Sequence, residues 1–216
     1  MTRIKICGIR EPAHALAAAE AGADYIGMIL APSRRQITVE QAAKIVAAVK
    51  GSSKTPPKMV GVFVNAPTVA VNYAAITAAL DMVQLSGQED EDYLAEIEAP
   101  KIKTVHIKKN LPDPVAMMSL RRSLASLKAA GVLPQLDSQG EGQGGGTGQT
   151  FDWSVAQKEG AGYDYMLAGG LTPENVAAAI GQLHPWAVDV SGGVETAGVK
   201  DAAKIRAFIQ AVRAAK

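Results

Sequence analysis

The sequence predicts an α/β fold, a single (β/α)8 TIM barrel that takes up residues 1–216 as one domain. Short runs rich in β-branched residues alternate eight times with longer, alanine-rich amphipathic segments, the pattern of parallel strands joined by crossover helices. No stretch of the chain has the composition of an interdomain linker. A barrel is favoured over an open sheet because closing the sheet leaves no exposed edge strand.

Each expected element follows from this alternation. The expected strands are short apolar or β-branched runs at 3–7, 23–30, 58–64, 81–87, 101–107, 132–137, 163–169 and 186–191. The expected helices are the segments between them, at 12–22, 38–49, 68–80, 91–99, 114–131, 152–160, 172–183 and 200–212.

Composition and charge exclude several classes of protein. The chain has 22 Lys+Arg against 21 Asp+Glu, a net charge of +1 and no long basic run, so we expect no nucleic-acid partner. No segment approaches the ~18–20 consecutive apolar residues of a membrane span, and the N-terminus lacks the apolar stretch of a signal peptide. Because Cys7 is the only cysteine, no intrachain disulfide forms. We therefore expect a cytoplasmic protein without a membrane partner.

Histidines are few and scattered, at His14, His106 and His184, with no second ligand at metal-binding spacing. We therefore expect no metal site.

Strand alternation indicates which side chains face the barrel lumen. In the first expected strand Ile4 and Ile6 face the helices, so the residues that alternate with them face inward. The same counting in three strands puts seven polar side chains on the inner face: Arg3, Lys5, Cys7, Gln135, Asp137, Asp189 and Ser191. Because active sites of such barrels lie at the carboxyl ends of the strands, the polar groups that end these three strands converge on one mouth.

Cys7 and Asp137 are the candidate catalytic residues. A lone cysteine is most often a small buried hydrophobe, but Cys7 lies at the rim, two residues after an inward Lys5 that favours the thiolate. It is a candidate base or nucleophile. Asp137 ends an apolar strand beside a glycine-rich stretch at 138–150, which favours a functional acid over a loop or helix cap.

Glycine-rich turns follow the last three expected strands. Gly169 and Gly170 follow the seventh strand, Ser191, Gly192 and Gly193 follow the eighth, and 144–148 follows the sixth. Such turns let backbone N–H groups approach a phosphate, and barrels of this type often bind phosphate after strands seven and eight. The alternative is ordinary turn geometry.

A pair of arginines follows the second expected strand. Arg35, beside Arg34, offers a guanidinium to a carboxylate in bidentate geometry. The alternative is a pair of solvated surface side chains.

Together these motifs resemble the phosphoribosylanthranilate isomerase family over nearly the whole chain. The resemblance rests on KICGIR in the first strand, VGVFVN, VQLSG and IKTVHI in the third to fifth, GGTGQTFDW after the sixth, LAGGLTPENV at the seventh, and DVSGGVE with GVKD at the eighth. Their order and spacing agree with eight strand–helix units.

The resemblance implies the Amadori rearrangement of N-(5'-phosphoribosyl)anthranilate to 1-(2-carboxyphenylamino)-1-deoxy-D-ribulose 5-phosphate in tryptophan biosynthesis, without a cofactor. It implies that Cys7 is the general base, Asp137 the general acid, Arg35 the partner of the anthranilate carboxylate and Asp189 a neighbour of the aminosugar. The implied phosphate site consists of backbone groups of Gly169, Gly170, Ser191, Gly192 and Gly193. The small-molecule substrate is the expected partner, and the chain is expected to be a monomer or a homodimer.

Three positions depart from the family pattern. Ser86 stands where histidine is usual, Gln36 where an aromatic residue is common, and Gly192 in place of a second serine. The stretch 138–150 is also longer than usual, and we expect it to close over substrate.

Two alternatives stay open. One is a sugar isomerase of histidine biosynthesis, or an enzyme acting on both substrates. Cys7 favours the anthranilate substrate. The histidine-pathway family resembles enzymes that use a pair of carboxylates, whereas this chain has a cysteine at the end of its first strand. The other is a non-catalytic phosphosugar-binding barrel.

Overall fold

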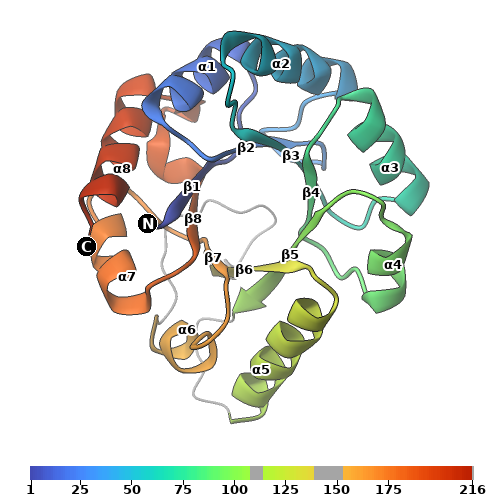
Figure 1. Cartoon of the computed structure of the whole chain (residues 1–216), viewed down its shortest axis with the longest axis vertical. Coiled ribbons are helices and arrows are strands. Elements are labelled where there is room, and N and C mark those ends of the chain that lie inside the picture. The colour runs from blue at the N-terminus through green and yellow to red at the C-terminus, as the bar shows by residue number, and fades with distance from the viewer. Residues whose placement is uncertain (108–113, 139–152, 216) are drawn as a thin grey trace.

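The computed structural model describes residues 1–107, 114–138 and 153–215. Its eight main strands form one closed parallel barrel in the order β1-β2-β3-β4-β5-β6-β7-β8, and β8 pairs with β1 to complete the ring. Figure 1 looks down the ring, with the helices arranged around its outside. The expected (β/α)8 barrel is confirmed.

The strands and helices alternate along the chain. The barrel strands are β1 (Arg3–Ile6), β2 (Tyr25–Ile29), β3 (Lys58–Phe63), β4 (Met82–Leu85), β5 (Lys101–Ile107), β6 (Leu133–Ser138), β7 (Met166–Leu167) and β8 (Ala187–Val190). The helices are α1 (Pro12–Ala21), α2 (Val39–Ser52), α3 (Thr68–Thr77), α4 (Glu91–Glu96), α5 (Pro114–Ala129), α6 (Trp153–Glu159), α7 (Val176–Leu183) and α8 (Ala202–Ala214). Among the described residues, no helix is both long and apolar enough to cross a membrane.

Local interactions define several helix ends. Thr38 begins α2 with a capping box, in which its hydroxyl accepts from the Gln41 N–H and the Gln41 side chain accepts from the Thr38 N–H. Asp201 caps α8 by accepting from two backbone N–H groups. Gly22 ends α1 in the left-handed region, at φ 97°, where a Cβ would be strained.

The alternation of side chains in the strands agrees with the sequence. Ile4, Ile6 and Val188 face outward and are buried in the main hydrophobic cluster against the helices. Inside the barrel, a separate cluster fills the end where the strands begin; its fully or almost fully buried members are Tyr25, Val60, Ile102, Met166 and Ala187. The amino-terminal end of the lumen is therefore apolar and packed, and polar groups lie above it.

One layer of the lumen carries most of this polarity. Alternate strands of such a barrel contribute to the same layer. The strand register therefore brings together one residue from each even-numbered strand: Gly27, Gln84, Gln135 and Asp189. The three polar members are buried. This layer lies just below the level of Cys7.

Most element bounds shift by one to three residues from the sequence expectation, and β7 and α7 depart from it most. Only Met166–Leu167 of the expected strand 163–169 pairs as β7. Helix α7 begins at Val176 and not at residue 172, because the Asn175 side chain accepts from the Thr172 N–H at 2.8 Å and donates to the Gly170 carbonyl at 2.9 Å. These bonds hold 172–175 as a turn.

A small addition follows β8 that the sequence analysis did not expect. A single 3-10 turn, η1 (Gly192–Val194), leads into an antiparallel pair, β9 (Glu195–Thr196) and β10 (Val199–Lys200). This hairpin places Glu195 and Lys200 opposite each other beside the end of β8.

Candidate active site

The predicted acid and base lie at the strand ends on one side of the barrel. Cys7 directly follows β1, and its N–H donates to the Val190 carbonyl at 2.8 Å. Asp137 lies near the end of β6, which β7 and β8 separate from β1. Cys7 and Asp137 therefore approach the mouth from different strands. Most of the stretch 138–150, residue 139 onward, lies outside the described residues, so its expected closure over substrate stays a prediction.

Lys5 and Asp189 form a buried ion pair below Cys7. The Lys5 Nζ donates to Asp189 Oδ2 at 2.9 Å, with the Lys5 side chain fully buried and that of Asp189 7% exposed. A Cβ on Gly27 would meet both Cys7 Sγ, at 2.8 Å, and Lys5 Cε, at 3.2 Å. The missing side chain at Gly27 thus makes room for Lys5 and Cys7 to lie side by side.

This environment acts on the Cys7 thiol in opposing directions. Burial raises the pKa of Cys7 most strongly, the Lys5 ammonium lowers it, the Asp189 carboxylate raises it and Lys200 lowers it. The resulting pKa lies above that of an ordinary thiol. Lys5 favours the thiolate as the sequence indicated, but burial outweighs it. The thiolate is therefore a minor but strongly basic species near neutral pH.

Buried acceptor oxygens in the lumen lack partners among the described residues. Gln84 Nε2 donates to the hydroxyls of Ser86 and Thr104 at 3.0 and 3.4 Å, and these hydroxyls lie 2.9 Å apart. Three buried oxygens in the same layer remain unsatisfied: Gln84 Oε1, Gln135 Oε1 and Asp189 Oδ1. Buried acceptors without donors are costly, so this layer suits a ligand rich in hydroxyl and amine donors.

The two predicted phosphate turns pack against each other. Gly169 and Gly170 both adopt left-handed φ angles, 92° and 64°, which favour glycine. A Cβ on Gly193 would lie 1.9 Å from the Leu171 carbonyl oxygen, so only glycine permits this approach. The turns after β7 and β8 therefore lie in contact at the mouth, where their backbone N–H groups suit an anion.

Arg35 lies in a buried charged cluster. Its Nε donates to Glu195 Oε1 at 2.6 Å and its Nη2 to Glu195 Oε2 at 3.0 Å, a bidentate pair. Lys200 Nζ donates to the same carboxylate at 2.8 Å and to the Ser191 carbonyl at 2.8 Å. The sequence analysis took Arg35 as the partner of a substrate carboxylate and missed the carboxylate that the protein itself supplies.

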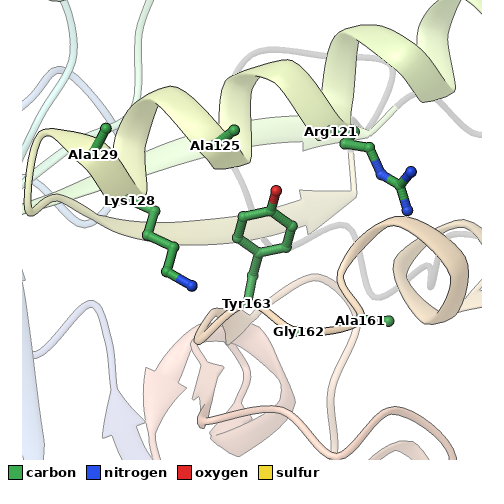
Figure 2. Close-up of a pocket in the computed structure, with 7 residues that line it drawn as sticks. All are labelled: Arg121, Ala125, Lys128, Ala129, Ala161, Gly162 and Tyr163. Carbon is green, nitrogen blue, oxygen red and sulfur yellow. The ribbon is translucent and has the colours of Figure 1, made fainter.

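A cavity lined by described residues lies away from this mouth. It has a volume of about 640 Å³ between α5 and the segment before β7. Figure 2 shows its lining, with Lys128 and Arg121 on the helix and Tyr163 opposite. None of the predicted site residues lines it, and it opens where β7 begins, whereas the predicted residues lie where strands end. Among the described residues, no three His, Cys, Asp or Glu side chains group closely enough to hold a metal ion.

Comparison with known proteins decides the family. The family model described as N-(5'phosphoribosyl)anthranilate (PRA) isomerase matches residues 4–211. The chain belongs to this isomerase family. An N-(5'-phosphoribosyl)anthranilate isomerase of Roseiflexus castenholzii is 45% identical over 217 residues, covering 98% of this chain and 98% of that protein.

Solved structures of the isomerase family share the whole fold. The phosphoribosyl anthranilate isomerase of Thermotoga maritima superposes with a TM-score of 0.85 at 35% identity, covering 99% of each chain. Another structure, of a phosphoribosyl anthranilate isomerase in complex with reduced 1-(o-carboxyphenylamino)-1-deoxyribulose 5-phosphate, has a TM-score of 0.81 at 32% identity and 99% coverage of each chain.

Within this isomerase the departures from the family pattern have structural consequences. Ser86 joins the hydroxyl network of the lumen, and its carbonyl oxygen lies 3.1 Å from Nε2 of His106 on the next strand. Gln36 donates to the Leu30 carbonyl at 3.3 Å. Gly192 opens the turn η1.

Sequence reasoning missed the roles of Glu195 and Lys200, although both belong to motifs that carry the resemblance, GVE and GVK. Their signal is the presence of two charged residues close after a glycine-rich turn. Their partner Arg35 is 160 positions away from Glu195 in the chain, so no local pattern links them.

Proposed function

We propose that this chain converts N-(5'-phosphoribosyl)anthranilate to 1-(2-carboxyphenylamino)-1-deoxy-D-ribulose 5-phosphate, a step of tryptophan biosynthesis. The observation that carries the proposal is family membership across 4–211 together with Cys7 and Asp137 at strand ends of the same barrel. The reaction is an internal redox exchange in which C2 of the sugar is oxidised and C1 reduced, so its atoms and electrons balance without a cofactor.

In this proposal Asp137 and Cys7 act in turn. Asp137 donates a proton to the furanose ring oxygen, the C1–O bond breaks, and the nitrogen lone pair forms an iminium at C1. Cys7, as the thiolate, then removes the C2 proton, and the electron pair moves to give an enolamine. Proton return at C1 and loss of the C2 hydroxyl proton yield the ketone. Separation of the acid and the base on β6 and β1 keeps them from neutralising each other.

Other predicted residues suit the remaining parts of the substrate. Arg35 offers a guanidinium to the anthranilate carboxylate, and the unpartnered Oδ1 of Asp189 suits a donor on the aminosugar. The proposed phosphate site is the joined backbone of the two glycine turns: Gly169, Gly170, Ser191, Gly192 and Gly193. Positive charge from the buried Lys200, which donates to the Ser191 carbonyl, favours an anion there.

Two alternatives make different predictions. An isomerase acting on the histidine-pathway substrate, alone or as a second substrate, turns over that bulkier phosphosugar. A binding-only barrel binds the reduced product analogue but shows no turnover. Retention of both Cys7 and Asp137 favours catalysis on the anthranilate substrate.

The decisive test is a fluorescence assay of phosphoribosylanthranilate consumption with Cys7→Ser and Asp137→Asn beside the parent chain. We expect turnover by the parent and a loss of roughly 100- to 10,000-fold in kcat/KM in each variant, with unchanged far-UV circular dichroism. Asp164→Asn, an exposed aspartate remote from the mouth, serves as the matched control and retains activity. A folded parent without turnover overturns the proposal.

The proposal includes a cytoplasmic location, which the single unpaired Cys7 supports. The expected assembly of the chain is either a monomer or a homodimer. Three exposed apolar side chains on α3, Val69, Tyr73 and Ile76, bear on this choice, since they lie on one helix face. Light scattering after size-exclusion chromatography distinguishes the two masses.

A further inference from the structure

Glu195 joins two buried cations at the mouth of the barrel. Arg35 binds it through two hydrogen bonds, and Lys200 binds Oε1 at 2.8 Å. The side chains of Glu195, Arg35 and Lys200 are 6%, 5% and 3% exposed. A third cation, the largely exposed Arg34, approaches Oε2 at 3.3 Å.

Opposite charges lie together in this buried cluster of described residues. One buried carboxylate faces the two buried cations Arg35 and Lys200. Burial raises the pKa of Glu195, but hydrogen bonds from Arg35 and Lys200 outweigh burial and hold that pKa at about 2, so the carboxylate stays ionised. The ionised Glu195 thus supplies a counter-charge to both buried cations.

The same cluster connects three loops. The Arg35 side chain, from the loop after β2, passes across the backbone of Gly8, where a Cβ would lie 2.7 Å from Arg35 Cδ and 2.9 Å from Ser191 Oγ. Gly8 has a φ of 76°, which also disfavours a side chain. Lys200 in turn donates to the Ser191 carbonyl. Arg35 is therefore held against the turn after β8, and Glu195 supplies two of the hydrogen bonds that hold it.

From this geometry we propose that Glu195 is a positioning residue, which orients the Arg35 guanidinium for the carboxylate end of the substrate and couples it to the anion-binding turn at Ser191. A planar guanidinium recognises a carboxylate only when its orientation is set, and a bidentate partner along its Nε–Nη2 edge sets that orientation. This inference rests on the proposed function, because that function supplies the aromatic carboxylate.

The test measures carboxylate recognition without turnover. Titration calorimetry gives the Kd of the reduced product analogue, reduced 1-(o-carboxyphenylamino)-1-deoxyribulose 5-phosphate, and of the counterpart that lacks the ring carboxylate. We expect the parent to prefer the carboxylate form and Glu195→Gln to lose roughly 10- to 100-fold of that preference, with little change for the counterpart. Glu20→Gln, an exposed glutamate of α1, is the matched control and keeps the parental preference.

A second comparison separates positioning from a general structural effect. If Glu195 acts through Arg35, then Arg35→Met loses the preference and adding Glu195→Gln to it causes no further loss. Equal weakening of both analogues in Glu195→Gln, or additive losses in the double variant, overturns the inference.

The outcome also distinguishes this inference from the proposed function. A parent that binds neither analogue overturns the proposed function and the inference together, whereas a parent and a Glu195→Gln variant with the same preference overturn the inference alone. If Glu195→Gln does not fold, the double variant Glu195→Gln with Lys200→Met keeps the buried charge difference of the parent and is measured in its place. The same loss of preference is expected from it, and retention of the preference overturns the inference.

Discussion

Cys7 lies beside two cations and a carboxylate, and together with burial these charges set the pKa of its thiol. The sequence identified its position at the end of the first strand, but not that Asp189 engages its neighbour Lys5 at 2.9 Å. Burial alone lowers the pKa of Lys5, yet the negative charges of Asp189 and Cys7 outweigh burial and raise it. The Lys5 ammonium is therefore held more strongly than that of an ordinary lysine.

Replacing Lys5 tests this arrangement. We expect Lys5→Met to raise the pKa of Cys7 further, because the thiolate then faces the Asp189 carboxylate without the ammonium. At pH values below the pKa of the thiol, a rise of one unit in that pKa lowers the thiolate fraction about tenfold, and kcat/KM falls with it. The alkaline shift is read from the pH profile of kcat/KM and from the rate of iodoacetamide labelling, which reports on Cys7 alone because it is the only cysteine.

Lys58→Met removes an exposed lysine of β3 and serves as the control, with the parental pH profile. An unchanged labelling midpoint in Lys5→Met contradicts the assigned role of Lys5.

At the scale of elements, the loops after β3 and β4 are held together by a buried ion pair. Lys103 of β5 donates to Glu89 at 2.7 Å and to the Gly87 carbonyl at 2.8 Å, and Glu89 accepts from the N–H groups of Gly87 and Asn65. The sequence predicted the strands that carry these loops, since each has a clear apolar run. It did not predict the pair, because its members come from different elements.

Breaking this pair should destabilise the fold. We expect Glu89→Gln to lower the free energy of unfolding by about 3 kcal/mol at pH 7, because Lys103 is left buried without its counter-charge. Burial raises the pKa of Glu89, but the hydrogen bond from Lys103 and backbone N–H donors lower it below its ordinary value. Its stabilising effect is thus complete above the unfolded pKa of about 4.3 and is lost as pH falls through the lower folded value.

Urea unfolding at pH 7 and at acid pH measures this effect. Lys50→Met is the matched control, because Lys50 pairs with Asp81 at 3.1 Å but both side chains are substantially exposed, 37% and 28%. Its cost should stay below about 1 kcal/mol. A Glu89→Gln cost no larger than that of Lys50→Met contradicts the structural role of the buried pair.

On the scale of the whole molecule, the first and last elements close the barrel. β1 pairs with β8, and α8 buries Ile205, Phe208 and Val212 in the main cluster that α1 also contacts. Arg213 of α8 donates to the carbonyls of Thr2 and Gly22 and pairs with Asp24. Figure 1 shows the two ends of the chain close together on one side.

Because closure needs both ends of the chain, we propose that residues 1–216 form one domain and unfold as one unit. The two tryptophans are suitable probes, since Trp186 packs against the inner cluster beside Arg3 and Trp153 lies on α6. We expect the urea transitions of Trp153→Phe and Trp186→Phe, followed by the remaining tryptophan, to coincide with far-UV circular dichroism of the same variant. Separate transitions within one variant indicate more than one unit.

Much of this molecule followed from the chain alone. The period of eight strand–helix repeats predicted the barrel, and alternation within strands predicted that Lys5 and Asp189 face inward, because both patterns are local. The motifs around Cys7, Asp137 and the glycine turns indicated the isomerase family, which the comparison confirmed.

The tertiary structure decided which groups meet. Lys5 and Asp189 are 184 positions apart, and Arg35 and Glu195 are 160 apart. Their pairing depends on closure between β1 and β8 and on the unpredicted hairpin after β8. The buried, unpartnered oxygens of Gln84 and Gln135 likewise lie in one layer only because alternate strands of the closed barrel contribute to the same layer. Local periodicity specifies which way a side chain points, but its partners and the pKa values they impose arise from distances that exist only in the closed barrel.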